Sequence, residues 1–376
     1  KAGFGYLGAS FDPLPEDSLE NFYINRFGRP LYNMFFERYT EKVWGRHPSQ
    51  ISADWGSQRV KGLSLLTTVW NAVTKPFRGG KTKETSLIEA FKYPKMGPGQ
   101  FYETMAEEVV RRGGEIRFNQ EVTGLRLEDG KITGVRTKDP GSGAEKELQA
   151  DAYFSSMPIK DLISAMAGKV PQKVREVAEG LPYRDFMTVG LLVKKLLLEN
   201  KTETETLHGG VPDNWIYIQE EDVLIGRLQI FNNWSPYMPK DPEHTMWIGL
   251  EYFCNEGDQY WEMPDEDFIE LAISELVKIK VIRREDVLDA CRIRVKKAYP
   301  AYFDTYAEFD LVKDWLGGIR NLYCIGRNGQ HRYNNMDHSM LTGIRAAEAL
   351  HGEIPPEEVW KVNTETEDHE AGQEES

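Results

Sequence analysis

The stretch LYCIGRNGQHRYNNMDHSMLTGIRAAEAL, residues 322–350, decides how the rest of the chain is interpreted. Its first residues, Leu322–Ile325, are apolar and favour β structure, which predicts a short buried strand. The strand would end at Gly326, where the chain can turn without a Cβ penalty. A helix with one buried face is predicted next, from apolar or small residues at Met340, Leu341, Ile344, Ala347 and Leu350.

The turn between this strand and helix carries groups that could hold a ligand. Asn335 or Asp337 can cap the helix through a side-chain oxygen. A helix N-terminus presents unpaired N–H groups and the positive end of the helix dipole, which suit an anion or an electron-rich carbonyl. Arg327, Arg332 and Tyr333 lie in the same turn. The pattern alone is equally typical of an ordinary strand–turn–helix corner with solvated arginines.

The turn also resembles a known signature. Gly326-Arg327, Gly329, Arg332-Tyr333 and Asn335–Ser339 are similar to the C-terminal flavin-binding motif of UDP-galactopyranose mutases. Those enzymes share a flavoprotein superfamily with amine oxidases, protoporphyrinogen oxidases and phytoene desaturases. The resemblance implies FAD as the cofactor and a mixed α/β, two-domain FAD-binding fold of the amine oxidase and mutase type.

The resemblance also implies roles for individual residues of this turn. Arg327 would contact the flavin and assist catalysis, while Tyr333 and Asn335 would bind the phosphates of the substrate. Cofactor contacts are expected from Gly326, Arg327, Met336, Asp337 and Ser339.

Size and composition bound the class of protein. With 376 residues, 40% of them hydrophobic, the chain can build a large core and two intertwined domains. The net charge of −14 disfavours a nucleic-acid or anionic-membrane partner. Three cysteines without CxxC spacing indicate buried thiols and a reducing compartment. With no signal peptide or membrane-spanning run, we expect a soluble cytoplasmic enzyme with a small-molecule substrate.

The first residues contain Gly3, Gly5 and Gly8, which form a nominal GxGxxG. That fingerprint needs a strand before it and a helix after it, and neither is indicated. Members of the flavoprotein superfamily begin with a true dinucleotide-binding fingerprint, so we expect this chain to be an N-terminally truncated portion of a longer flavoprotein. Gly80-Lys81-Thr82 likewise lacks the first glycine and the strand of a phosphate loop.

The segment from Ser18 to Trp44 predicts a pair of helices, interrupted at Gly28 and Pro30. Its second half resembles the mutase segment that lines the sugar side of the flavin, where Phe35 and Trp44 match two ligand-facing positions and Thr40 takes the place of an asparagine. Without the resemblance, these aromatic residues are typical of a helical core.

The middle of the chain predicts one helix and several strands. A glycine-rich turn precedes a helix over 100–112, followed by strands over 115–119, 121–127, 132–137 and 151–155, with a hairpin turn at Asp129-Gly130. This order resembles the middle flavin-domain segment of the superfamily, which would place Val122 near the adenine end of FAD.

A further group of candidate residues lies in the expected substrate domain. Strand alternation puts Trp215 and Tyr217 on one face, and Arg227 follows ten residues after Tyr217. The mutases have a similar trio, in which the arginine reaches the diphosphate; the planar guanidinium suits paired phosphate oxygens. Tyr299 resembles a further phosphate-binding tyrosine. An amphipathic strand with an exposed arginine is the alternative interpretation.

These observations predict five regions and one leading function. The regions are a helical substrate-side segment (1–88), the middle of the FAD-binding domain (89–160), an antiparallel substrate domain (161–300), the C-terminal part of the FAD-binding domain (301–352) and a disordered acidic tail (353–376). The function implied by the resemblance is isomerisation of a nucleotide sugar, pyranose to furanose, by reduced flavin. An FAD-dependent oxidoreductase of the amine oxidase or protoporphyrinogen oxidase type, or an inactive fragment of either, are the alternatives.

Overall fold

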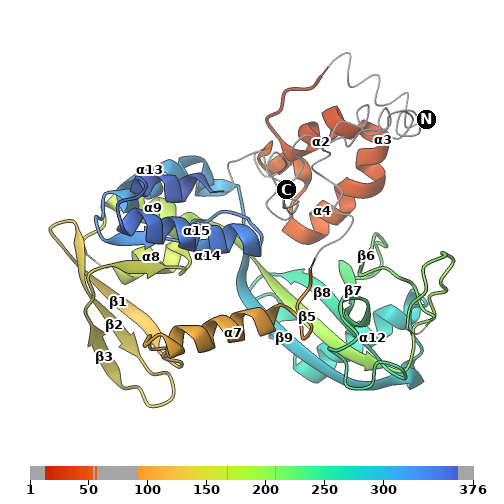
Figure 1. Cartoon of the computed structure of the whole chain (residues 1–376). Helices are drawn as coiled ribbons and strands as arrows, with labels where there is room; N and C mark the ends of the chain where they lie inside the picture. Colours follow the sequence, from red (N-terminus) through yellow and green to blue (C-terminus); the bar gives the residue numbers. More distant parts are fainter. Residues whose placement is uncertain (1–12, 54–55, 57–91, 167, 208, 363–376) are drawn as a thin grey trace, which may run out of the picture.

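The structure is a computed structural model that describes residues 13–53, 56, 92–166, 168–207 and 209–362. The nominal GxGxxG and the Gly80-Lys81-Thr82 stretch lie outside these residues. Three groups of elements are visible in Figure 1: a helical segment at the top, a twisted sheet at the lower right, and a mixed lobe at the left. The mixed α/β character expected from the sequence is confirmed.

The helical segment forms the predicted pair. It consists of α2 (Leu19–Phe27), α3 (Arg29–Leu31), a π-helical turn η1 (Tyr32–Phe36) and α4 (Glu37–Trp44). The Ser18 hydroxyl caps α2 by accepting from the Asn21 N–H at 3.3 Å. α4 ends at Gly45, whose φ of +65° is a left-handed conformation that glycine adopts readily. A short 3₁₀ turn, η2 (Pro48–Gln50), follows.

The sheet at the lower right has five antiparallel strands in the order β6-β7-β8-β5-β9. The strands are β5 (Tyr183–Val193), β6 (Trp215–Tyr217), β7 (Arg227–Ile230), β8 (Met246–Cys254) and β9 (Val287–Pro300). From Met187 to Val193, every second residue of β5 is fully buried against α12 (Asp265–Lys278) and its neighbours, because strand alternation sends those side chains to one face. Shorter elements, α10 (Phe231–Trp234), α11 (Gln259–Glu262) and η3 (Arg284–Asp286), connect the strands.

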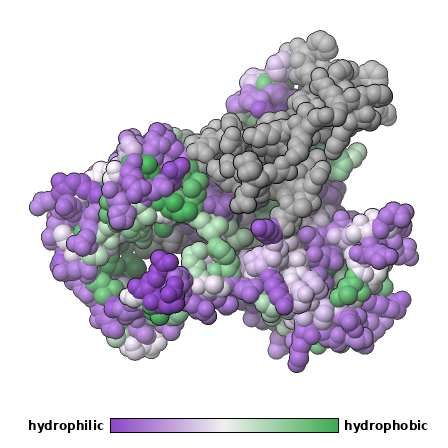
Figure 2. Space-filling model, viewed as in Figure 1, coloured by the Kyte–Doolittle hydropathy of each residue, from purple (hydrophilic) through white to green (hydrophobic). Residues whose placement is uncertain are grey.

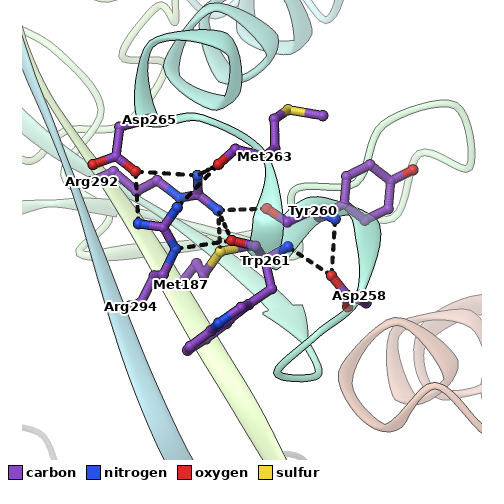
Figure 3. Close-up of polar contacts among 8 residues, drawn as sticks. All are labelled: Met187, Asp258, Tyr260, Trp261, Met263, Asp265, Arg292 and Arg294. Atoms are coloured by element: carbon purple, nitrogen blue, oxygen red, sulfur yellow. Dashed lines mark hydrogen bonds and ion pairs between the residues drawn. The ribbon is translucent and has the colours of Figure 1, made fainter.

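Two arginines on β9 hold the junction between α11 and α12 (Figure 3). Arg292, whose side chain is fully buried, donates to the carbonyls of Tyr260 and Met263 at 2.5 and 2.6 Å. Arg294 donates to the Trp261 carbonyl at 3.0 Å. Burial lowers the pKa of Arg292, and the nearby Arg294 adds to that effect. Arg292 and Arg294 donate hydrogen bonds to carbonyl groups that have no partner within α11 at its C-terminal end. We therefore assign the two arginines a structural role.

The lobe at the left contains the strand, turn and helix on which the sequence analysis depends. β10 (Leu322–Cys324) pairs in parallel with β4 (Tyr153–Ser155). α14 (Gly326–Gly329) and α15 (Met336–Leu350) follow β10. A hairpin of β1 (Glu121–Glu128) and β2 (Lys131–Lys138) turns at Asp129 and Gly130, both at positive φ, and β3 (Glu145–Leu148) extends it. The helices are α7 (Pro98–Arg111), α8 (Ile159–Ala165), α9 (Gln172–Gly180) and α13 (Phe309–Gly317), with a 3₁₀ turn, η4 (Asp304–Glu308).

Three sequence predictions are wrong at the level of local structure. Residues 115–119 form no strand, because no described strand pairs with them. The tail predicted to be disordered from residue 353 contains a 3₁₀ helix, η5 (Pro356–Lys361), which is held by the buried Val359; residues 363–376 lie outside the described part. Cys254 and Cys324 are buried as expected, whereas Cys291 is exposed, since it pairs with Gly190 on the sheet face opposite the apolar core.

Two further findings bear on the class of protein. None of the described helices is long and apolar enough to cross a membrane. Among the same residues, no group of three or more histidine, cysteine or carboxylate side chains is arranged to hold a metal ion.

Candidate flavin and substrate site

The strand–turn–helix corner is held by its own backbone and by β9. Gly326 has a φ of +73°, and its N–H donates to the Thr342 hydroxyl at 2.8 Å, which ties the turn to α15. The Arg327 guanidinium donates from Nε to the Asn334 carbonyl at 3.0 Å and from Nη1 to the Ala298 carbonyl at 3.1 Å. Arg327 therefore fixes the loop before α15 against the end of β9.

The start of α15 contains buried polar atoms that lack hydrogen-bond partners. Asn335 is the N-cap residue, but its side chain makes no cap hydrogen bond, contrary to prediction. Asn334 is 3% exposed; its Oδ1 accepts from the Ser339 hydroxyl at 2.8 Å, while its Nδ2 has no partner. The Asp337 carboxylate lies beside His338, with Oδ1 3.1 Å from Nδ1.

The electrostatics at this helix end favour an ionised Asp337. Burial raises the pKa of Asp337, but the His338 side chain and the backbone N–H of His338 outweigh burial and lower it below its ordinary value. The corner thus presents the Asn334 amide donor without a partner, an ionised Asp337 carboxylate beside His338, and a helix N-terminus that no side chain caps. Buried polar groups of this kind normally have partners.

This donor set fits a flavin. The ring and side chain of FAD carry carbonyl, N–H and hydroxyl groups, so the Asn334 amide can donate to the cofactor and the Asp337 carboxylate can accept from it. Met336, which is 52% exposed, adds an apolar surface beside these groups. The residues that would hold FAD here are Gly326, Arg327, Asn334, Met336, Asp337 and Ser339.

Aromatic rings in successive contact, which we call the aromatic run, extend from the turn between β10 and α15 to the five-stranded sheet. Arg327 lies over the Tyr333 ring, with Cζ 4.7 Å from the centroid, and Tyr333 stacks on Tyr299 at 5.8 Å. Tyr299 contacts Phe253, with ring centroids 5.9 Å apart, and Phe253 in turn contacts Tyr39 at 6.4 Å. The C-terminal turn and β9, far apart in sequence, are therefore part of one surface.

The same run reaches the predicted substrate residues on β6 and β7. The Tyr39 ring meets Tyr217 edge-on at 4.9 Å. Arg227 lies over Trp215, with Cζ 4.8 Å from the ring centroid, and 5.7 Å from that of Tyr217. The structure thus connects the two predicted catalytic arginines, Arg227 and Arg327, through one set of aromatic side chains.

Arg227 is held by a buried carboxylate on the next strand. Its Nε and Nη2 donate to Glu251 Oε2 at 2.7 and 2.6 Å, and Glu251 is 1% exposed. The Gln229 amide donates to the other oxygen of Glu251. Burial opposes the charge on Arg227, but Glu251 outweighs it and raises the pKa of Arg227 above its ordinary value. The guanidinium is consequently always charged and has a defined orientation.

Three other predicted site residues lie beside this run or away from it. Trp44 is 4% exposed and packs in an apolar cluster, edge-on to Tyr299 of the run and to Phe303, so its ligand contact stays a prediction. Phe35 is 51% exposed on η1, where its carbonyl accepts from Gln219 at 3.3 Å. Val122 lies in β1, whose neighbours in the described part are β2 and α8, so its adenine contact stays a prediction.

Sequence analysis missed three residues of this surface: Tyr39, Phe253 and Glu251. Burial raises the pKa of Tyr39 above its ordinary value, so its hydroxyl stays protonated. Glu251 faces Arg227 directly in the β7–β8 register, where opposite charges attract. A charged residue inside the apolar strand Trp247–Phe253 was the available signal.

Comparison with known proteins assigns the chain to a family. The sequence model of the flavin containing amine oxidoreductases matches residues 10–351. This chain belongs to that family. The assignment confirms the FAD cofactor and the flavoprotein fold expected from the sequence, and it supports an enzyme. A search of curated proteins finds no match.

Three solved structures illustrate the similarity of fold. A crystal structure of reduced UDP-galactopyranose mutase matches with a TM-score of 0.75 and 20% identity, over 98% of this chain and 76% of that chain. A proposed protoporphyrinogen oxidase from an Exiguobacterium species matches with a TM-score of 0.57 and 16% identity, over 87% and 66%. An oxidoreductase from Methanosarcina mazei follows at 0.52 and 13%, over 87% and 67%. At these identities the neighbours show the fold alone.

Proposed function

We propose that this amine oxidoreductase family member acts on a nucleotide sugar and isomerises it between pyranose and furanose forms with reduced FAD, as a UDP-galactopyranose mutase does. The observation that carries the proposal is the aromatic run that connects Arg327, at the flavin corner, to Arg227. A nucleotide sugar bound along it would place its sugar near the flavin and its diphosphate near cationic and hydroxyl donors. FAD, when bound, supplies the reactive ring.

Arg227 has the geometry of a diphosphate ligand. Glu251 occupies its Nε and Nη2, which leaves the Nη1 edge of a side chain that is 19% exposed. A guanidinium with one edge fixed by a carboxylate can donate to phosphate oxygens from its other edge without losing its orientation. In the proposed role Arg227 and Arg327 stabilise the negative charge that develops on the departing diphosphate.

The tyrosines would add neutral donors beside the two arginines. Tyr217, Tyr299 and Tyr333 lie along the same aromatic run. Their hydroxyl groups can hydrogen-bond phosphate oxygens without adding charge. We expect Asn335, at the start of α15, to contribute from the flavin side.

UDP titration tests the diphosphate site. Trp215 lies directly under Arg227, so we expect saturable UDP binding to change tryptophan fluorescence, and a Trp215→Phe variant to lose most of that signal. Arg227→Lys keeps the positive charge but removes the planar guanidinium, which can pair with two phosphate oxygens at once. We expect this variant to bind UDP at least tenfold more weakly. Unchanged UDP affinity in Arg227→Lys would overturn the assignment.

An activity assay then tests the reaction. With dithionite-reduced, FAD-loaded protein, we expect interconversion of UDP-galactopyranose and UDP-galactofuranose, detected by chromatography. Arg227→Ala should lose turnover while flavin absorbance is retained.

The second candidate is an FAD-dependent oxidoreductase, which the family assignment favours. Anaerobic addition of an amine or porphyrinogen substrate would then bleach the flavin, and oxygen would restore its colour. Bleaching without any response to UDP would replace the mutase proposal. A chain that binds no flavin under either condition would support the third alternative, an inactive fragment.

A further inference from the structure

One strand of the five-stranded sheet leaves its regular ladder where it enters the lobe at the left. β9 advances four residues, from Val295 to Tyr299, while its partner β5 advances only two. Lys297 lies inside this irregularity with a φ of +53°, a conformation that residues other than glycine adopt infrequently. We call residues 296–298 the β9 bulge. In Figure 1 β5 and β9 run from the sheet into the lobe, and in Figure 2 these two parts meet across the middle of the view.

Two carboxylates hold the β9 bulge, one from each part of the molecule. Asp185 on β5 is 7% exposed, and its Oδ1 accepts from the Lys297 N–H at 2.6 Å while its Oδ2 accepts from the Glu256 N–H at 2.6 Å. Asp161 in α8 accepts from the Lys297 ammonium with both oxygens, at 2.7 and 2.6 Å. A residue at positive φ persists where its surroundings fix it. Lys297 is therefore fixed from the sheet and from the lobe together.

The β9 bulge offers two successive carbonyls to the turn that carries Arg327. The Lys297 carbonyl accepts from Asn328 Nδ2 at 3.0 Å, and the Ala298 carbonyl accepts from Arg327 Nη1 at 3.1 Å. In a regular strand the carbonyls of successive residues point to opposite edges. Neighbouring side chains of one turn reach both carbonyls because the backbone departs from a regular strand at Lys297.

The contacts between these two segments continue beyond the β9 bulge. The Ala301 carbonyl lies 3.1 Å from His331 Nε2, and the Tyr302 hydroxyl accepts from the Tyr333 N–H at 2.7 Å. Both His331 and Tyr302 are almost completely buried. We call residues 327–333 the flavin turn. The segment that begins at the β9 bulge thus contacts the flavin turn at four points, and its position determines where the flavin turn lies.

We propose that Lys297 is a positioning residue of the flavin site. Held by Asp161 and Asp185, it sets the β9 bulge, and the β9 bulge fixes Arg327 relative to the sheet. Tyr299, which follows the β9 bulge, stacks on Tyr333 of the flavin turn with the rings 10° apart. The same device therefore also fixes the aromatic pair that joins the two parts of the molecule. The inference rests on the FAD cofactor of the family and on the proposed contact of Arg327 with the flavin, and it does not depend on the substrate.

The exposure of the ion pair separates positioning from stability. The side chains of Lys297 and Asp161 are 29% and 40% exposed, and ion pairs of this kind contribute little to the free energy of unfolding. We therefore expect loss of the pair to change the Tm of the whole chain by less than about 2 °C. Its effect should instead be local to the flavin turn.

The expected chemical consequence concerns the reduced state of the flavin. Reduction adds negative charge to the flavin ring, and a guanidinium beside the ring stabilises that charge. A displaced Arg327 would stabilise it less. Loss of the Lys297 ion pair should therefore lower the reduction potential of bound FAD.

Hydrogen exchange in the chain without cofactor tests the first step. Lys297→Met keeps an apolar stem of similar length and removes the ammonium group. We expect the amides of Arg332 and Tyr333, which donate to the Arg327 carbonyl and the Tyr302 hydroxyl, to exchange at least tenfold faster. The amides of β8 should exchange as in the parent. Unchanged exchange in the flavin turn would overturn the proposal, and so would equally faster exchange in β8, which would indicate a general loss of stability.

The reduction potential of bound FAD tests the second step. The FAD-loaded protein is titrated with dithionite beside a reference dye, for Lys297→Met and for Asp161→Asn, which break the same ion pair from opposite sides. We expect the ratio of reduced to oxidised flavin at a given potential to fall about tenfold in both variants. For a two-electron couple this lowers the midpoint potential by about 30 mV. A midpoint potential equal to that of the parent in both variants would overturn the proposal.

Two matched variants complete the test. Lys297→Arg keeps a cation opposite Asp161, so its exchange and its midpoint potential should resemble those of the parent. Lys296→Met removes the neighbouring lysine, which is 59% exposed and pairs with Glu256, and should change neither measurement. A shift in Lys296→Met as large as that in Lys297→Met would assign the effect to the net charge of β9 and overturn the proposal. No nucleotide sugar is used, so failure of the proposed isomerisation would leave these outcomes unchanged.

Discussion

The five-stranded sheet and the two-stranded β10–β4 sheet differ in how completely the described residues enclose them. The five-stranded sheet packs its inner face against α12 in an apolar cluster that includes Met187, Leu250 and Leu276, all fully buried. The β10–β4 sheet has two strands, and no described strand pairs with the other edge of β4; α7, in the same lobe, has no buried residue. Both regions have an apolar core, since Leu162 and Leu316 are buried in the lobe that contains β4 and β10. The comparison teaches that the two regions differ in how much apolar side-chain surface the described residues leave exposed.

The largest effect is expected from the ion pair inside the five-stranded sheet. Arg227→Ala removes the partner of Glu251, which is 1% exposed, and leaves a buried carboxylate unpaired. We expect the free energy of unfolding in urea to fall by about 3–5 kcal/mol. Adding Glu251→Gln should restore part of this loss, since the amide carries no charge. A single variant as stable as the parent would show that this sheet is more hydrated than its burial indicates.

Cavity formation in the same sheet ranks second. Leu250 is fully buried in β8, so Leu250→Ala should lower the free energy of unfolding by about 2–5 kcal/mol. Urea titration gives this value together with the m-value, which should not change. A loss below about 1 kcal/mol would contradict a self-contained core.

Acid should weaken the flavin-side region through His331. This imidazole is fully buried against Tyr183 and Tyr306, and burial lowers the pKa of His331 from 6.5 to about 4. The neutral form is therefore the folded form: its contribution is complete above pH 6.5 and is lost as the pH falls toward 4. Between pH 7 and pH 4.5 the free energy of unfolding should fall by about 2 kcal/mol from this group.

The control for the acid effect is His331→Gln. Its unfolding free energy should lose that part of the pH dependence, although its stability at pH 7 will itself differ. An unchanged pH profile in the variant would assign the acid sensitivity to other groups.

The smallest effect should come from the uncovered helix. Val110 on α7 is 55% exposed, so Val110→Ala removes little buried area and improves helix propensity. We expect the free energy of unfolding to change by less than about 0.5 kcal/mol. A loss comparable to that of Leu250→Ala would show that α7 is already covered, and would remove the contrast between the two regions.

Local elements were predictable where the pattern was long and its turn chemistry explicit. The apolar strand, the turn at Gly326 and the existence of α15 were recognisable because strand, glycine turn and helix each have their own signature. The predicted buried face of α15 was wrong: Thr342, Ala346 and Ala349 are buried, whereas Ile344 and Leu350 are 55% and 47% exposed. The hairpin at Asp129-Gly130 was recognisable for the same reason. Residues 115–119 show the limit of such patterns, because a strand forms only where another strand pairs with it.

For the candidate site, the family resemblance predicted which residues take part. Only the tertiary structure showed which of these residues contact one another. Arg227, Tyr299 and Tyr333 lie on three separate segments, and no local pattern shows that one aromatic run connects them. The sequence also did not show that Glu251 holds Arg227, since that contact depends on the register of two strands.

By itself the sequence determined the family signature, the cofactor that this signature implies, and most of the helices and strands. These features depend on residue types and on hydrophobic periods of two residues in strands and 3.6 residues in helices, which can be recognised in a single sequence. The tertiary structure decided which aromatic residues are core, as with Trp44, which carboxylate pairs with Arg227, and which apolar face stays uncovered. Those outcomes depend on contacts between distant segments, and burial is a property of such contacts rather than of any one residue.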